Sequence, residues 1–256
     1  MTLFRRMSLA VLSGVAVPAL LVAQEGRGGE PPKNLQVLPK DFTRPQVIAV
    51  MRSFTAALGV RCEHCHAADT TGAQGRGGGA PLDFPADTKE TKKIAREMFK
   101  MVMDINGKYL PLTGRTIGDR DKVSCETCHH GLVKPQTLRA ALAGAVEAKG
   151  ADSATALYRD LRTRYYGTGA YDFGEMSLPR AAMELARANQ RPAALSLLKL
   201  NLEYYDKSAP TYQLLAQISL ATGDSVAARD ALTKAIALEP NNQMLKNMMQ
   251  RIAPKP

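Results

Sequence analysis

Apolar residues recur at helical spacing along most of this chain, a pattern that predicts an all-α protein. The first helix is predicted over residues 44–58. Thr43 suits its N-cap, Pro45 fits its first turn, and Gly59 is typical of a helix C-terminus. One face carries an apolar stripe made of Val47, Met51, Phe54 and Leu58. The stripe indicates that this face covers something buried.

A second helix is predicted over residues 88–109, where Asp87 and Glu90 have capping-box spacing. Its apolar face is formed by Ile94, Met98, Met101 and Ile105, whereas Met103 points elsewhere. Between the two helices, residues 67–86 are rich in glycine but lack the order of a phosphate-binding motif. We therefore predict a surface loop there.

Alanine and leucine dominate from about residue 136, and residues 177–240 are self-similar at a period near 34. The matched positions are Leu178 with Tyr212, Ala182 with Ala216, Ala194 with Ala228, Leu198 with Leu232, and Leu202 with Ile236. A helix-turn-helix unit of this length resembles the tetratricopeptide repeat. We predict that residues 137–256 form a helical-hairpin repeat domain that docks a protein partner.

The first 23 residues have the pattern of an export signal. Arg5 and Arg6 precede a short apolar run over residues 7–21, and cleavage is expected after Ala23. The alternative is that this segment is retained as an N-terminal anchor. Residues 24–33 read as a flexible leader, and we expect the mature protein in the periplasm.

The candidate chemistry lies in two copies of the motif Cys-x-x-Cys-His, at residues 62–66 and 125–129. In this motif two thiols attach covalently to one haem, and the adjoining histidine ligates the iron. We therefore predict two haem c groups in a domain over residues 34–136. The predicted thioether residues are Cys62, Cys65, Cys125 and Cys128, and the predicted proximal ligands are His66 and His129.

The cysteines have three alternative uses. A zinc site needs paired knuckles, but Cys65 and Cys125 are 60 positions apart and a histidine follows both pairs. A redox-active CxxC needs a strand-turn-helix context, which the helical surroundings do not provide. Two structural disulfides in an oxidising compartment are the third alternative. Two complete motifs in an exported chain with only 4 cysteines favour haem.

The remaining iron ligands are predicted to be methionines. His64 lies inside the first motif and His130 follows a proximal ligand, so neither can reach the far face of its own haem, and bis-histidine ligation would require one of them to cross to the other haem. Methionine is the usual substitute in cytochromes c. Met51 is the candidate for the first haem, and Met98 or Met101 for the second. The alternative is that they are ordinary core methionines.

Residues 34–136 resemble part of the photosynthetic reaction-centre cytochrome c subunit family. The matching pieces are NLQVL at 34–38, Met51 ahead of LGVRC at 58–62, AREMFKMV at 95–102, Ile105-Asn106, and VSCETCHHG at 123–131. In that family a methionine-ligated haem takes its methionine from the helix before its own motif. The resemblance therefore implies Met51 for the first haem and Met98 rather than Met101 for the second. Because the photosynthetic members carry four haems and lack the repeat-like tail, it implies a haem fold and not photosynthesis.

The chain has a formal net charge of +10, and basic residues crowd the second predicted helix. These residues are Lys89, Lys92, Lys93 and Arg96. They form either a solvated face or a set of partners for haem propionates or for an acidic redox protein. Because the chain is predicted to be exported, nucleic acid is not expected as a partner.

Together these features predict a periplasmic dihaem cytochrome c that carries electrons between a donor and an acceptor protein. No small-molecule substrate is expected. The enzymatic alternative is a dihaem peroxidase or small-molecule reductase, which needs one open haem face with acid–base groups beside it. In a third reading the repeat region is primary, and the haems act as a redox sensor for an assembly.

Overall fold

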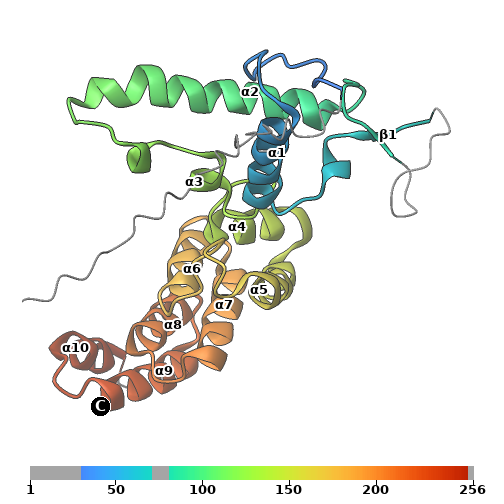
Figure 1. The fold of residues 1–256 in the computed structure, drawn as a ribbon. Helices are drawn as coiled ribbons and strands as arrows, with labels where there is room; N and C mark the ends of the chain where they lie inside the picture. Colours follow the sequence, from blue (N-terminus) through green and yellow to red (C-terminus); the bar gives the residue numbers. More distant parts are fainter. Residues whose placement is uncertain (1–29, 71–80, 253–256) are drawn as a thin grey trace, which may run out of the picture.

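The structure is a computed structural model that describes residues 30–70 and 81–252. These residues form an almost entirely helical fold, as predicted (Figure 1). The predicted export signal, residues 24–29 of the predicted leader and residues 71–80 of the predicted loop lie outside the described residues. None of the helices in the described ranges combines the length and hydrophobicity needed to cross a bilayer.

Helix α1 spans Arg44–Leu58, with the bounds that the sequence predicts. Thr43 is its N-cap, and the Thr43 backbone N–H donates to Oε1 of Gln46 at 2.7 Å. Gly59 ends the helix in the left-handed conformation at φ 66°. Glycine is favoured there because it has no Cβ to clash.

Helix α2 spans Glu90–Asp104 and continues into a π-helical turn, η2 (Ile105–Tyr109), and a 3₁₀ turn, η3 (Leu110–Thr113). The predicted cap at Asp87 is wrong, because Lys89 occupies the N-cap position. The carboxylate of Asp87 instead pairs with Lys92 and Arg96, one and two turns into the helix.

Short elements connect α1 to α2 and α2 to the C-terminal part. A 3₁₀ turn, η1 (Cys62–His64), follows α1, and strands β1 (Ala67–Ala68) and β2 (Leu82–Asp83) pair antiparallel. The segment predicted as a simple loop is therefore closed at its base by a two-residue ladder. After α2 come η4 (Asp119–Asp121) and the short helix α3 (Cys125–His129).

The C-terminal part is a stack of helices in which most helices adjacent in sequence pack against one another (Figure 1). The helices are α4 (Leu138–Lys149), α5 (Ala151–Tyr165), α6 (Ser177–Arg187), α7 (Arg191–Tyr204), α8 (Ala209–Ala221), α9 (Ser225–Leu238) and α10 (Gln243–Ile252). In addition, α5 packs on α7 and α4 packs on α6. Small alanines such as Ala182 and Ala194 are fully buried between neighbouring helices, with leucines such as Leu198 filling the space around them.

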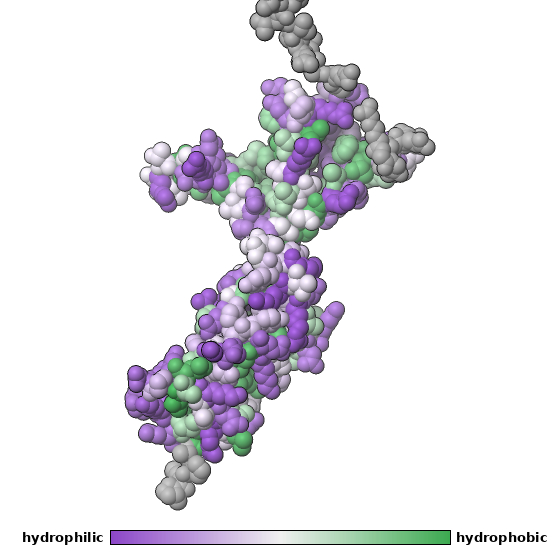
Figure 2. Space-filling model, turned by 60° about the horizontal axis from the view of Figure 1, so that its bottom comes forward, coloured by the Kyte–Doolittle hydropathy of each residue, from purple (hydrophilic) through white to green (hydrophobic). Residues whose placement is uncertain are grey.

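Buried apolar side chains are distributed very unevenly between the two parts. Both hydrophobic clusters belong to the C-terminal stack, the first beginning at Leu138 and the second at Ala216. Among the described residues before Leu138, only Leu38, Ala57 and Leu132 are buried and apolar. Figure 2 shows the molecule narrowing between the two parts. The N-terminal part therefore has helices but hardly any protein core of its own.

Candidate functional site

The first Cys-x-x-Cys-His motif forms a tight turn directly after α1. The backbone N–H groups of Cys65 and His66 both donate to the Cys62 carbonyl oxygen, at 3.2 and 3.0 Å. Four predicted site residues, Met51, Cys62, Cys65 and His66, line one cavity of about 620 Å³. This volume lies within the range of about 300–1,000 Å³ that is typical of cofactor pockets.

The cavity wall is largely apolar. The whole stripe predicted on α1 faces the cavity, and Phe84 and Leu35 add apolar surface from other segments. Met51 stands on α1, whereas His66 follows the motif, so two separate elements bring a thioether and an imidazole to the same space. Such a pair is suited to hold a metal between them.

His66 is buried, with 9% of its surface exposed, and its ring meets Phe84 edge-on at 5.0 Å between ring centroids. Its Nδ1 atom has no hydrogen-bond partner among the described residues. Burial, followed by the nearby charge of Lys92, lowers the pKa of His66. A neutral imidazole is the form that ligates metals.

The second motif forms helix α3, so Cys125, Cys128 and His129 follow at the i, i+3 and i+4 spacing of one helical face. His129 is 8% exposed, and its Nδ1 lies 2.7 Å from the Leu132 carbonyl oxygen. Because a carbonyl can only accept, Nδ1 carries the proton in this contact. The Nε2 atom then keeps a lone pair that can bind a metal ion.

Asn106 holds the chain immediately before the second motif. Its side-chain Nδ2 donates to the Val123 carbonyl oxygen, and the Val123 backbone N–H donates to its Oδ1, both at 2.8 Å. This two-way pairing connects the start of the η2 turn, just after α2, to the segment that leads into α3. The sequence reasoning did not give Asn106 this role, although it lies in a piece of the family resemblance.

The two methionine candidates for the second site both lie on α2. Met98 is half-buried, and Met101 is 44% exposed. Neither belongs to the lining of the cavity beside the first motif. Met98 as a ligand of the second haem, with Met101 as second choice, stays a prediction.

A backbone contact joins the segments beside the two Cys-x-x-Cys-His motifs, at residues 57–59 and at Gly131. The Gly131 N–H donates to the Ala57 carbonyl oxygen at 2.8 Å, and a Cβ added to Gly59 would lie 2.3 Å from the Gly131 oxygen. Gly59 lies three residues before Cys62, and Gly131 lies three residues after Cys128. The only sequence signal for this contact was a glycine beside each motif.

The thiols of the two motifs bear on one alternative use of the cysteines, a redox-active CxxC pair. All four are free thiols, and no cluster of three or more His, Cys, Asp or Glu residues suited to a metal ion occurs within residues 30–70 and 81–252. Burial raises the pKa of the Cys65 and Cys125 thiols, whereas a redox-active CxxC pair needs a lowered pKa.

The exposed apolar surface of α2 provides a further test of fit. Ile94 is 54% exposed and Met101 is 44% exposed, although both lie on the apolar face of the helix. A helix with such a face normally buries it. An N-terminal part that lacks a protein core fits large apolar groups attached at residues 62–66 and 125–129.

Comparison of the chain with models of known families and with curated proteins found no match.

Proposed function

We propose that this chain is an exported dihaem c-type cytochrome that transfers electrons between protein partners in the periplasm. The observation that carries the proposal is the convergence of Met51, Cys62, Cys65 and His66 on one cavity. When bound, each haem supplies an iron that cycles between its ferric and ferrous states.

The residues around the first cavity would bind the first haem and fix its orientation. Cys62 and Cys65 would tether the haem covalently, and His66 and Met51 would ligate its iron. Apolar neighbours such as Phe84 exclude water, which favours a saturated iron that binds no outside ligand. This arrangement suits electron transfer better than turnover of a small molecule.

At the second motif, Cys125 and Cys128 provide the tether and His129 the proximal ligand. The Leu132 carbonyl accepts from Nδ1, which would leave Nε2 as the atom that binds the iron. Met98 is the proposed second axial ligand, with Met101 as second choice. The haem domain over residues 34–136 then obtains from two porphyrins the core that its side chains do not supply.

We further propose that residues 137–256 are tetratricopeptide-like repeats that dock a protein. Helices α7 and α9 begin at Arg191 and Ser225 and end at Tyr204 and Leu238, which reproduces the period of 34 at both ends. Three of the five matched pairs are also fully buried at both positions, since Ala182 and Ala216, Ala194 and Ala228, and Leu198 and Leu232 are each 0% exposed. The proposed partners are redox proteins, including acidic ones.

The test is expression with a haem-attachment system, followed by intact mass and optical spectra. Two added porphyrins and low-spin ferric spectra with a methionine-to-iron charge-transfer band are expected. Met51→Ala should remove this band from one haem. Met103→Ala is the matched control, because Met103 is 46% exposed and lies off the apolar face of α2. A mature protein without porphyrin would end the proposal, and rapid peroxide turnover would favour the peroxidase instead.

A further inference from the structure

Two cations of α2 are kept largely out of water beside the first cavity. Lys92 and Arg96 have side chains that are 12% and 13% exposed, and both line that cavity. Lys93, on the same helix, is 52% exposed and pairs with Glu90 one turn earlier. The basic face predicted on this helix is therefore two surfaces, one solvated and one directed at the cavity.

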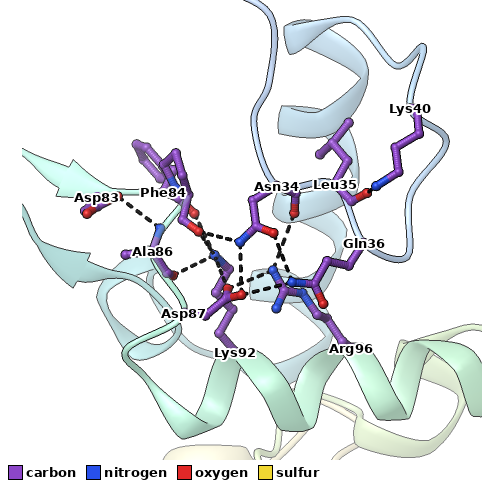
Figure 3. Close-up of polar contacts among 11 residues, drawn as sticks. Asn34, Leu35, Gln36, Lys40, Asp83, Phe84, Ala86, Asp87, Lys92 and Arg96 are labelled. Carbon is purple, nitrogen blue, oxygen red and sulfur yellow. Dashed lines mark hydrogen bonds and ion pairs between the residues drawn. The ribbon is translucent and has the colours of Figure 1, made fainter.

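The anion that Lys92 and Arg96 share is Asp87. Its Oδ1 lies 3.0 Å from Lys92 Nζ and 2.8 Å from Arg96 Nη2 (Figure 3). Side-chain amides of Asn34 and Gln36 donate to Oδ2, each at 3.0 Å. The contact with Arg96, then those with Asn34 and Lys92, hold the pKa of Asp87 far below its usual range. Asp87 thus stays ionised.

This cluster has more positive than negative charge. Two cations face one carboxylate, which leaves one positive charge without a counterion in a poorly hydrated place. Among the described residues no ion pair joins Asp83 to Lys92 or Arg96, and its carboxylate accepts instead from the Ala86 N–H at 3.0 Å (Figure 3). Charges removed from water are normally paired, so the cluster is suited to one more anion.

The hydrogen bonds identify which cation can accept that anion. Lys92 Nζ is surrounded by the carbonyl oxygens of Phe84, Pro85 and Ala86, at 2.7–3.0 Å, as well as by Asp87. Its three N–H donors are therefore in use. Arg96 makes its contacts within the described residues through Nη2 alone, so its Nε and Nη1 donors are left for another acceptor.

We propose that Arg96 binds a propionate carboxylate of the haem attached at Cys62 and Cys65, and that Lys92 adds its charge without a direct bond. Guanidinium and carboxylate form paired, charge-assisted hydrogen bonds, which matches the donors left on Arg96. This inference rests on the proposed function, and it assigns the anionic end of the first haem to the α2 side of the cavity.

The experiment compares Arg96→Gln with Lys93→Gln in the mature holoprotein. Both changes remove one positive charge from α2, but only Arg96 faces the cavity. Arg96→Gln should shift a propionate bending band in the resonance Raman spectrum. It should also lower one midpoint potential, because loss of a nearby positive charge favours the ferric state. Lys93→Gln should leave both unchanged, and Arg96→Lys should recover the potential more than the band.

Asp87→Asn separates propionate binding from a purely structural role of Arg96. This change removes the internal anion but keeps the guanidinium, so the propionate band should persist and the potential should rise. An unmoved band in Arg96→Gln, or an equal shift in Lys93→Gln, would overturn the inference. Peptide mass mapping of the wild type is done first. Absence of haem on the peptide that contains Cys62 would refute the proposed function itself, whereas haem there with an unmoved band refutes only the role of Arg96.

Discussion

Replacing Gly59 with alanine tests the backbone contact between the end of α1 and Gly131, which holds the segments beside the two Cys-x-x-Cys-His motifs together. Gly59 has a φ of 66°, and an added Cβ would lie 2.3 Å from the carbonyl oxygen of Gly131, nearer than real Cβ atoms come to other atoms. Because the obstacle is backbone, no side-chain rotation relieves the clash. The backbone around Gly131 therefore has to move away from α1.

The expected cost has two parts. An alanine held in the left-handed region costs about 1–2 kcal/mol. Moving Gly131 breaks its hydrogen bond to the Ala57 carbonyl, which contributes about 1 kcal/mol. Gly59→Ala should therefore lower the free energy of unfolding by about 2–3 kcal/mol, through strain and lost contact together.

Two other glycines provide matched controls. Gly114 has a φ of 70° with no atom within 4 Å of an added Cβ, so Gly114→Ala reports the strain alone, about 1–2 kcal/mol. Gly107 has neither a positive φ nor a close neighbour, and Gly107→Ala should be neutral or slightly stabilising. Urea unfolding of the mature proteins, followed by circular dichroism, gives the three midpoints. If Gly59→Ala cost no more than Gly114→Ala, the close approach of the two segments would be refuted.

Three further predictions concern other parts of the chain. Asn106→Ala removes both bonds to Val123 and should cost about 2 kcal/mol in urea unfolding, with less haem attached at Cys125; full stability and attachment would contradict the role of Asn106. Because the pKa of Asp87 is lowered by folding, its stabilisation is present above the unfolded pKa of about 3.9 and is lost as pH falls through the folded value. The difference in unfolding midpoint between wild type and Asp87→Asn should thus be steady from about pH 5 to 7 and shrink below about pH 4; a gap that widens in acid would be inconsistent with this. Leu198→Ala should cost about 2–5 kcal/mol because Leu198 is fully buried, whereas the 70% exposed Val226 should tolerate alanine within about 0.5 kcal/mol.

Local signals made parts of the fold predictable. The bounds of α1 follow from Thr43, Pro45 and Gly59, residues whose backbone preferences act within one turn. The stripe on α1 also showed which face meets the cavity, since helical spacing alone places Met51 beside Phe54 and Leu58. Such features depend on neighbours in sequence, so the sequence contains them.

Features that depend on distant segments were missed or misread. Asp87 has the spacing of a cap, but Lys92 and Arg96 compete for its carboxylate together with Asn34, which comes from 53 residues earlier. A nearer contact was also missed: the Leu132 carbonyl oxygen lies 2.7 Å from Nδ1 of His129, three residues before it, and this distance decides which ring nitrogen carries the proton. The sequence gives these residues but not the distances between them. Those distances decide whether the Asp87 carboxylate caps the helix or pairs with Lys92 and Arg96.

The uneven placement of apolar side chains has a consequence for the order of maturation. The C-terminal stack can close on its own leucines and alanines without any added group. The N-terminal part, on the proposed function, waits half-assembled with Cys62 and Cys128 still exposed. On that proposal, the delay keeps the thiols accessible to an enzyme that attaches haem. An N-terminal part that folded tightly before attachment would leave no space for the porphyrins.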